Sequence, residues 1–454
     1  MATTYLKRTT WGTPTNKKKF TFSFWFKNSK INKPDEECFL TSLTDPYASN
    51  NRLHMSIDGG EQLKIEQNDL DGYNFQMKTN RLFLDPTGWT HAVFKVDTTQ
   101  TTEANRFKMF LNGVEETSWA IENYPELNLD IKVPETDRDV YIGTWSGSGQ
   151  YWDGYMAYYY YTDGYAYDAD TFGEFDSDSG EWKINTSPSV NYGTNGFLVL
   201  KDGNTYTDQS SNSNDFTLGG GTLTNTEDCP SDVFCTFNIL DNYYQAGTYS
   251  NGNTTFQTNT TNYTYNAGTI GVSKGKFYWE VEYDAKSGGN VEAIIGITST
   301  QPTTTTKALG TYPNDWGYHT QNVTSYYLNN DVYTAYGTAY TEGDIIGVAL
   351  DADNNKLYFS KNGTWQNSGD PTSGSTGTGA LSITAPSSTP LGAYFPSVTF
   401  YAGGNNGTFK ANFGNGYFGT TAISSEGTNA SGIGKFEYDV PTGYTALSTK
   451  GLNE

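Results

Sequence analysis

The feature that most constrains this fold is an alternating run of residues between Gly275 and Thr298. From Phe277 to Asp284, apolar or aromatic side chains occupy every second position, and a tyrosine and three acids stand between them. A two-residue period is that of a β-strand with one buried and one wet face. A Gly-Gly-Asn turn and a short β-branched run from Val291 to Ile297 then predict a second strand.

A second block, from Gly343 to Trp365, predicts an antiparallel hairpin. An apolar strand over 345–350 is followed by a polar turn at 351–355 and a return strand over 357–359. Asn362-Gly363 predicts a tight turn, because both residue types accommodate positive φ. The Gly/Ser/Thr-rich stretch between Pro371 and Pro390 is expected to be an exposed loop.

These blocks resemble the SPRY (B30.2) domain. The family's landmarks are a G-K-x-Y-W-E-V strand and a G-D-x-I-G-V-x-L-D hairpin that ends in L-x-F-x-x-N-G. Here they read GKFYWEV from Gly275, GDIIGVALD from Gly343 and LYFSKNG from Leu357. The resemblance implies a β-sandwich that serves as a binding platform, and it implies no reaction.

The N-terminal third predicts another set of strands. Its segments FTFSFWF from Phe20, GWTHAVF from Gly88, MFLNGV from Met109 and YIGTW from Tyr141 alternate large and small side chains or end in turns. They resemble the laminin-G and concanavalin A-like jelly rolls. His91 lies on one of these strands with Trp89, and we expect it to belong to the packing.

Three further tracts resemble the form of this domain found in virion proteins of tailed bacteriophages. They are FGEFDSDSGEWK over 172–183, YGTNGF over 192–197 and DQSSNSNDFT over 208–217. Ordinary laminin-G domains lack these tracts. The resemblance therefore implies a virion protein, made in the cytoplasm of the host cell.

Composition agrees with an all-β fold of two jelly-roll sandwiches in tandem. The chain has 454 residues, 15% of them aromatic, with 49 glycines and no long helical periodicity. That length is too great for one sandwich. We predict a concanavalin A-like/laminin-G-like sandwich over 1–190, a connector with short strands over 191–261, and a SPRY-like sandwich over 262–454.

Charge and cysteine content exclude several classes of protein. The net charge of −22 repels phosphate backbones, so we expect no nucleic-acid partner. No apolar span approaches the ~20 residues of a membrane helix, and no signal peptide begins the chain, so we expect no membrane insertion. Cys38, Cys229 and Cys235 cannot all pair, which favours free thiols and leaves a small Cys229–Cys235 loop disulfide as the alternative.

Two acidic patterns are candidates for chemistry. Glu280, Glu282 and Asp284 share one strand face and could hold an acid and a base for glycoside hydrolysis, but solvent-facing charge on a strand is the favoured interpretation. Asp176 and Asp178, in a glycine-containing acidic turn, could bind Ca²⁺ through carboxylate oxygens. No other cofactor is expected.

Two aromatic loops are candidates for contact with a glycan or a protein partner. Aromatic rings stack on sugar faces, and amides and carboxylates bond sugar hydroxyls. Rings near turns also often belong to a core or an interface, and that alternative stays open. The first loop offers Trp145, Tyr151 and Trp152, and the second offers Tyr312, Asp315, Trp316 and Tyr318.

The resemblances together predict a non-enzymatic phage virion protein, either a fibre, a tail appendage or a capsid decoration. It would present these loops to host surface polysaccharide or to other virion proteins. A homo-oligomer is expected, and trimers are common in such appendages. The alternatives are a carbohydrate-degrading depolymerase of the tailspike type and a purely architectural cement protein without a ligand.

Overall fold

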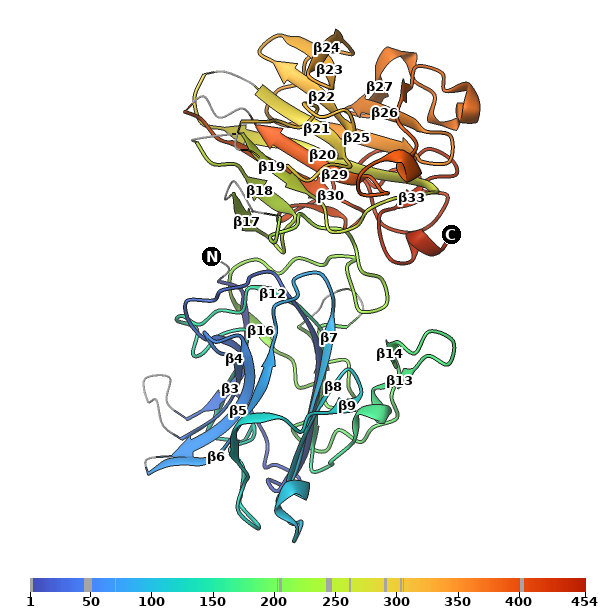
Figure 1. Ribbon diagram of the computed structural model, residues 1–454. Coiled ribbons are helices and arrows are strands. Elements are labelled where there is room, and N and C mark those ends of the chain that lie inside the picture. The colour runs from blue at the N-terminus through green and yellow to red at the C-terminus, as the bar shows by residue number, and fades with distance from the viewer. Residues whose placement is uncertain are drawn as a thin grey trace. The chain divides into compact units, whose positions relative to one another are not determined.

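The computed structural model describes residues 3–44, 51–69, 71–201, 203, 206–241, 247–260, 263–289, 292–302, 304, 306–400 and 404–454. The chain divides into two compact units, Met1–Asn225 and Thr226–Glu454. In both units β-sheets dominate, and the helices of the described residues are 3-10 segments of three to six residues. This confirms the all-β prediction (Figure 1). None of the helices in the described ranges is long and apolar enough to cross a membrane.

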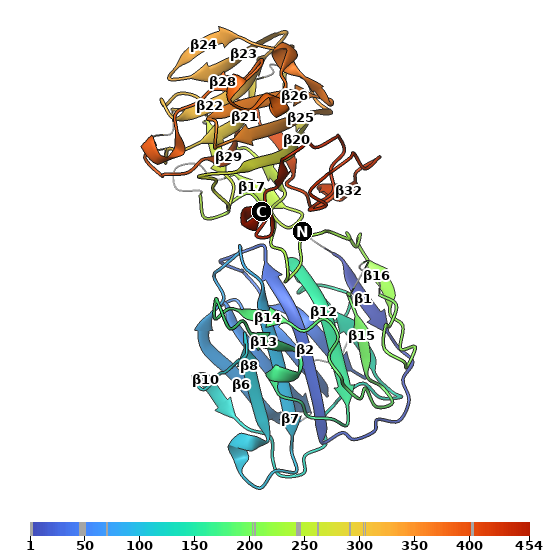
Figure 2. The same cartoon turned by 90° about the vertical axis from the view of Figure 1, so that its right-hand side faces the viewer.

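The first unit is a sandwich of two antiparallel sheets, which Figures 1 and 2 show as opposing layers. The eight-stranded sheet has the order β10 (Trp119–Asn123), β6 (Gly72–Leu82), β5 (Gln62–Asp69), β4 (Arg52–Ile57), β3 (Glu37–Leu43), β11 (Asp139–Ile142), β1 (Tyr5–Arg8), β16 (Thr217–Gly220). The six-stranded sheet has the order β15 (Phe197–Val199), β12 (Gly154–Asp163), β2 (Lys19–Asn28), β7 (Thr90–Asp97), β8 (Phe107–Leu111), β9 (Val114–Glu115). A hairpin of β13 (Gly173–Phe175) and β14 (Trp182–Ile184) and the 3-10 segments η1 (Glu103–Asn105) and η2 (Ala169–Thr171) complete the unit.

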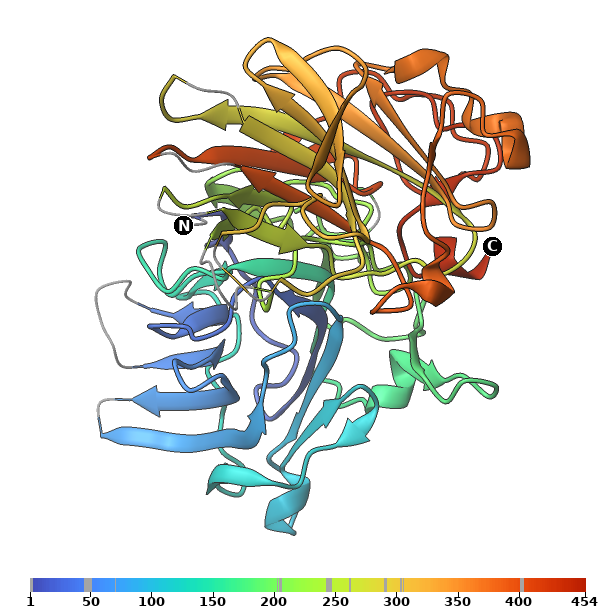
Figure 3. The same cartoon turned by 45° about the horizontal axis from the view of Figure 1, so that its top comes forward.

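The second unit is also a two-sheet sandwich, seen from another side in Figure 3. Its larger sheet has the order β17 (Thr248–Ser250), β18 (Thr255–Gln257), β30 (Gly407–Asn412), β20 (Lys276–Lys286), β25 (Asp344–Asp351), β26 (Lys356–Lys361), β27 (Thr364–Trp365), with β28 (Leu381–Ser382) on β26 and β33 (Thr445–Ala446) on β20. The other sheet has the order β19 (Thr264–Ala267), β29 (Phe395–Phe400), β21 (Glu292–Thr298), β22 (Asp315–Gln321), β23 (Thr324–Asn329), β24 (Val332–Ala335). The smaller elements are the hairpin β31 (Tyr417–Phe418) and β32 (Thr421–Ala422), and η3 (Gln366–Ser368), η4 (Pro371–Thr376), η5 (Pro386–Ser388) and η6 (Gly451–Asn453).

Some stretches between these elements differ from the prediction. The residues predicted as a connector over 191–261 are shared between the units, since β15 and β16 complete the first and β17 and β18 begin the second. The predicted exposed loop between Pro371 and Pro390 is wrong in part, because Pro371, Leu381 and Pro386 are buried. Val291, predicted to begin a strand, lies outside the described residues.

Each unit has its own core, and aromatic rings dominate both. The four phenylalanines of β2 are at most 1% exposed, and Phe24 stacks on Tyr159 with 4.7 Å between ring centroids. Phe22 stacks on Tyr161 at 4.5 Å. The alternation in β2 therefore places its rings between the sheets, as predicted. In the second unit Trp279 and Tyr283 of β20 are buried in the same way.

The outer face of the six-stranded sheet in the first unit is covered by other residues around His91 and is not exposed to solvent there. His91 is 1% exposed, as its predicted place in the packing requires, and its ring stacks between Trp25, at 4.7 Å, and Trp182, at 6.0 Å. Trp182 comes from the β13–β14 hairpin, and its Nε1 donates to His91 Nδ1 at 3.0 Å. Burial lowers the pKa of His91 to about 3, so the imidazole is neutral at pH 7.

Both predicted Asn-Gly turns are present. Asn112 and Asn362 each have a φ of 46°, and the following glycines have φ of 78° and 77°. In each turn the Asn side chain accepts a hydrogen bond from the neighbouring strand, from His91 N at 2.7 Å and from Ile345 N at 2.8 Å. Positive φ at both residues fits the twist of the flanking strands.

We expect Gly113→Ala to destabilise the first unit by several kcal/mol, roughly 3 kcal/mol or more, because the added Cβ would overlap the Trp182 ring. Gly180→Ala is the matched control, since Gly180 has a similar φ of 73° and open space around it. It should cost only about 1–2 kcal/mol, the penalty of left-handed backbone. Chemical denaturation measures both changes, and equal losses would contradict the role of Trp182.

Candidate functional site

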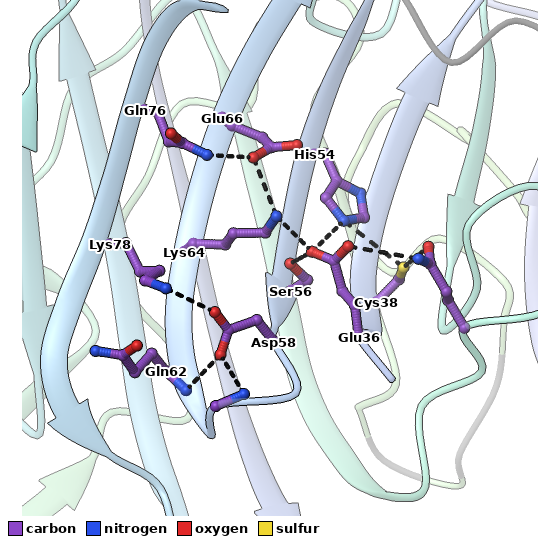
Figure 4. A network of polar contacts seen from close by, with 12 residues as sticks. Glu36, Cys38, His54, Ser56, Asp58, Gln62, Lys64, Glu66, Gln76 and Lys78 are labelled. Atoms are coloured by element: carbon purple, nitrogen blue, oxygen red, sulfur yellow. Dashed lines mark hydrogen bonds and ion pairs between the residues drawn. The ribbon is translucent and has the colours of Figure 1, made fainter. Parts of the chain in front are cut away.

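The outer face of the eight-stranded sheet carries a network of polar and charged side chains, shown in Figure 4. In β4, Leu53, Met55 and Ile57 belong to the core, so Arg52, His54 and Ser56 lie on the opposite face. Strand register aligns this face in two rows across the sheet. One row is Thr41, His54, Glu66 and Gln76, and the other is Cys38, Ser56, Lys64 and Lys78.

Glu36, just before β3, is the centre of the network. Its Oε1 lies 3.1 Å from His54 Nε2 and 2.8 Å from Lys64 Nζ, and it accepts from the Ser56 hydroxyl. Gln150 Nε2 donates to its Oε2 at 3.4 Å. Burial alone would raise the pKa of Glu36, but His54 and the Lys64 ammonium hold it well below its usual range. Glu36 is therefore ionised at neutral pH.

Lys64 joins Glu36 to a second acidic centre. Lys64 and Lys78 stand directly opposite each other on β5 and β6, a pairing that would be repulsive without partners. Glu66 Oε2 lies 3.1 Å from Lys64 Nζ, and Glu66 Oε1 lies 2.7 Å from Arg52 Nη2. Asp58 Oδ2 lies 2.9 Å from Lys78 Nζ. Each of these charges thus has an opposite charge within hydrogen-bonding distance. Figure 4 shows the contacts of Lys64 and Lys78.

The same network brings together a thiol, an imidazole and a carboxylate. Cys38 Sγ lies 3.8 Å from His54 Nε2, which also faces Glu36. Nucleophilic chemistry requires the thiolate, and burial raises the pKa of Cys38 well above its usual value. Cys38 is fully buried. The cluster therefore holds a neutral thiol in a structural role. Neither Cys229 nor Cys235 forms a disulfide bond in the described part of the chain.

Trp145, one of the predicted binding residues, lies over this network, and Tyr151, another, lies on the same loop beside Tyr5. The Trp145 ring is 4.9 Å from the His54 ring and 4.3 Å from the Arg52 guanidinium carbon, and it is partly exposed. Tyr151 is also partly exposed, and its ring lies 6.2 Å from Tyr5. We call the partly exposed rings of Tyr5, Trp145 and Tyr151 the Trp145 surface.

The loop that presents these rings is held by hydrogen bonds at several points. Thr144 Oγ1 donates to Gly149 O at 2.8 Å, and Tyr151 Oη donates to Gly147 O at 2.7 Å. Cys38 N donates to Gln150 O at 3.0 Å, which ties the loop to β3. Trp152 follows this loop, but it is 4% exposed and packs 4.4 Å from Phe39 in the core. Its ring does not face solvent.

The second predicted loop also contains both partly exposed and buried side chains. Tyr312 and Trp316 are partly exposed, and Trp316 packs against the core of the second unit. Asp315 and Tyr318 are completely buried. Asp315 accepts from Thr298 Oγ1 at 2.8 Å and from Tyr265 Oη at 3.3 Å, and burial raises its pKa to about 7. The structure therefore places only two of these four side chains at the surface.

The predicted calcium ligands form a self-contained turn. Asp176 Oδ1 accepts from Asp178 N at 3.1 Å and from Ser179 N at 2.8 Å, and its Oδ2 pairs with Lys183. These partners, Lys183 above all, lower the pKa of Asp176. Within the described part of the chain, no three His, Cys, Asp or Glu side chains gather as a metal site.

The acids of β20 were expected to face solvent, and for Glu280 this is wrong. Glu280 is fully buried because residues 437 and 438 return over it and donate their backbone N–H groups at 2.9 Å each. Tyr278 Oη and Asn412 Nδ2 also donate to it, at 3.0 and 3.2 Å. Burial raises the pKa of Glu280 to about 7. Glu282 and Asp284 pair with Lys410, at 3.6 and 2.5 Å.

The sequence analysis missed Glu36, Arg52, His54, Lys64 and Glu66. A signal for them exists, because Arg52-x-His54-x-Ser56 and Lys64-x-Glu66 put polar groups at every second position beside apolar ones. Finding the network itself requires the register that places these strands side by side.

Comparison with known protein families identifies a domain in each unit. Residues 2–163 match the concanavalin A-like lectin/glucanases superfamily, and residues 276–416 match the SPRY domain. The chain therefore carries a concanavalin A-like domain followed by a SPRY domain. Both are typical binding and protein-interaction modules.

Solved structures similar to the chain include two SPRY domains and stonustoxin. The SPRY domain of human HERC1 is 18% identical, with a TM-score of 0.30, and the match covers 38% of this chain and 96% of that one. The TRIM65 PSpry domain is 16% identical, with a TM-score of 0.29, and covers 39% and 88%. Stonustoxin is 21% identical, with a TM-score of 0.27, and covers 39% and 27%. No curated protein sequence matches the chain.

We expect Glu36→Gln to lower the free energy of unfolding by roughly 3 kcal/mol at pH 7, because Lys64 and its neighbours lose a half-buried counter-charge. Glu115→Gln is the control, since Glu115 pairs with Lys108 at 2.9 Å on an exposed strand. That change should cost less than about 1 kcal/mol. Denaturant titration of both variants tests the difference, and similar losses would contradict it.

Asp315 gives a prediction about pH. Its pKa is about 7 when folded and about 3.8 when unfolded, so between these values the folded state binds more protons. The contribution of Asp315 to the free energy of unfolding is therefore most favourable below about pH 4, and it falls as the pH rises from 4 to 7. Asp315→Asn should leave stability unchanged at pH 4 and raise it at pH 8 by up to about 4 kcal/mol. Unfolding curves from pH 4 to 8 measure this, and parallel profiles for both proteins would contradict it.

Proposed function

We propose that this chain is a non-enzymatic structural protein of a tailed-phage particle, and that it binds bacterial surface glycan through the Trp145 surface. The tandem of two binding-module families supports a binding role. The tracts over 172–183, 192–197 and 208–217 support the phage assignment by their resemblance to virion proteins. On this proposal the protein resides in the virion and contacts other virion proteins.

The observation that carries the proposal is the presentation of Trp145 and Tyr151. Both rings are partly exposed on a loop whose ends are hydrogen-bonded to β3 and whose middle is held by hydrogen bonds within the loop. A loop already held in one conformation loses little entropy when it binds. Aromatic rings supply flat contact area for a sugar face, and the partly exposed Gln150 on the same loop supplies a polar group.

The chemistry of the buried acids supports binding without turnover. Glu280, the first acid of the candidate hydrolytic group, is enclosed by four hydrogen-bond donors. Glu282 and Asp284 share one lysine. An acid and a base for glycoside hydrolysis must flank the bond that is cleaved. These carboxylates are instead engaged with their own chain.

Glycan binding can be tested with the full chain and surface polysaccharides purified from candidate host bacteria. We expect saturable binding to a host polysaccharide, with no release of oligosaccharide. Trp145→Ala should weaken binding roughly tenfold or more, because the ring supplies stacking area. Tyr73→Ala is the control, since Tyr73 is an aromatic residue 52% exposed on β6, outside the Trp145 surface.

Each other result points to a different function. Release of oligosaccharide would replace the proposal with a depolymerase. Unchanged binding by the Trp145→Ala variant would show that the Trp145 surface is not the glycan-binding site. An absence of binding to every polysaccharide, together with density for the chain in images of an intact particle, would favour the architectural cement protein.

A further inference from the structure

The smaller sheet of the second unit ends in a strand whose outer edge is open. β24 comes last in the strand order of this sheet, and among the described residues it pairs with β23 alone. Figures 1 and 2 both show β24 at the margin of the second unit. All four of its residues are exposed, with Val332 at 56% and Tyr333 at 51%. The edge of a sheet in this state can accept another strand.

Two residues of β24 direct their backbone hydrogen-bonding groups away from the sheet. Tyr336 N, just past the strand, donates to Ser325 O at 3.2 Å, on the side of β23. Backbone groups two residues apart in an antiparallel strand point the same way, so those of Thr334 also face β23. Tyr333 and Ala335 alternate with these positions. Their N–H and C=O groups therefore point outward, where no strand of the described residues pairs with β24.

This edge lacks the features that usually prevent pairing with another chain. Natural edge strands carry lysine, proline, inward-pointing charges or a β-bulge. β24 contains neither a charged residue nor proline, and its register on β23 is unbroken. Between Gln321 and Glu342 the only charged residue is Asp331, which lies 3.7 Å from Lys307 Nζ. In a chain with a net charge of −22, such an edge lets two copies approach with little local repulsion.

The sequence of β24 is self-complementary. In an antiparallel pairing with two-fold symmetry about Thr334, Tyr333 of each copy lies opposite Ala335 of the other. The outward N–H and C=O groups of these residues then form four hydrogen bonds between the copies. Each Tyr333 ring covers a small alanine, and the two Thr334 side chains meet as a favourable cross-strand pair. Asp331 lies opposite Gly337, so no two acids face each other.

Tyr333 is already held in position on the single chain. Its ring lies 5.7 Å from the Tyr326 ring and 5.6 Å from the ring of His319, which is buried. A side chain that is ordered beforehand loses little entropy when it enters an interface.

From the open edge, its neutrality and its self-complementary sequence we infer that β24 pairs with β24 of a second copy of this chain and forms a two-fold symmetric dimer. Such a contact uses the same surface on both copies, so it closes at two. A four-residue edge buries less area than a standard interface, and we expect a dissociation constant that is roughly micromolar or higher. The inference does not depend on the proposed glycan function, which uses the first unit.

Sedimentation velocity of the full chain from about 1 to 500 μM should show a reversible shift from the monomer to twice its mass. Thr334→Lys sets two ammonium groups opposite each other on the symmetry axis and should raise the dissociation constant roughly tenfold or more. The added lysine also lowers the net negative charge, which by itself would favour association. Thr248→Lys is the control, since it makes the same change in charge at an exposed residue of β17, an end strand of the larger sheet. It should leave the dissociation constant unchanged.

A disulfide cross-link tests the register of the pairing. The two Thr334 Cβ atoms should lie roughly 4.5–5.5 Å apart, close to the separation that a disulfide spans. Thr334→Cys should therefore give a covalent dimer when the oxidant diamide takes up the two electrons and two protons that the paired thiols release. Thr248→Cys should not, and the unchanged chain controls for the partly exposed Cys229. Circular dichroism should show that each variant keeps its fold.

Three results would overturn the inference. A monomer at every concentration would leave the edge to a strand of another protein. A trimer, or a dimer that Thr334→Lys leaves unchanged, would show that the copies meet elsewhere. Cross-linking of Thr248→Cys as readily as of Thr334→Cys would show that the two β24 strands do not pair about Thr334.

Discussion

The stacking of aromatic rings between paired sheets is the interaction on which both units depend. In the first unit Phe22 and Phe24 stack on Tyr161 and Tyr159 from the neighbouring strand β12. In the second unit Tyr283 stacks on Phe400 at 6.2 Å. A slip of one residue in either register would turn these rings outward, so burial of the rings fixes which side chains lie on the outer faces.

The outer faces then determine where polar groups must find partners. In the first unit Trp182 from the β13–β14 hairpin covers His91, and Trp145 covers His54. In the second unit residues 437 and 438 cover Glu280. Most covered polar groups are hydrogen-bonded, because a buried group without a partner costs free energy. The segments that cover these groups therefore also supply many of their hydrogen bonds. They are an integral part of each fold.

The strands and the Asn-Gly turns could be predicted because their signals are local. Alternation in β2 and β20 marks the core side, and Asn112 and Asn362 mark their turns by residue type. The state of the other face could not be predicted this way. Glu280 is buried by residues more than 150 positions away, and nothing within β20 signals that contact. The same limit applies to the candidate site, where aromatic residues near turns include the half-exposed Trp145 and the buried Trp152.

The charged network beneath Trp145 explains why such a loop can serve recognition without being mobile. Glu36 bonds Gln150 of the loop, and Arg52 lies against the Trp145 ring, so the sheet holds the loop from below through charges that are themselves paired. A buried ionic network adds little net stability, because desolvation offsets attraction. Its contribution here is geometric, because it links the loop to the sheet at Gln150 and at Trp145. On the proposed glycan function, a surface held in this way would lose little loop entropy on binding, which favours selective contact over adaptable contact.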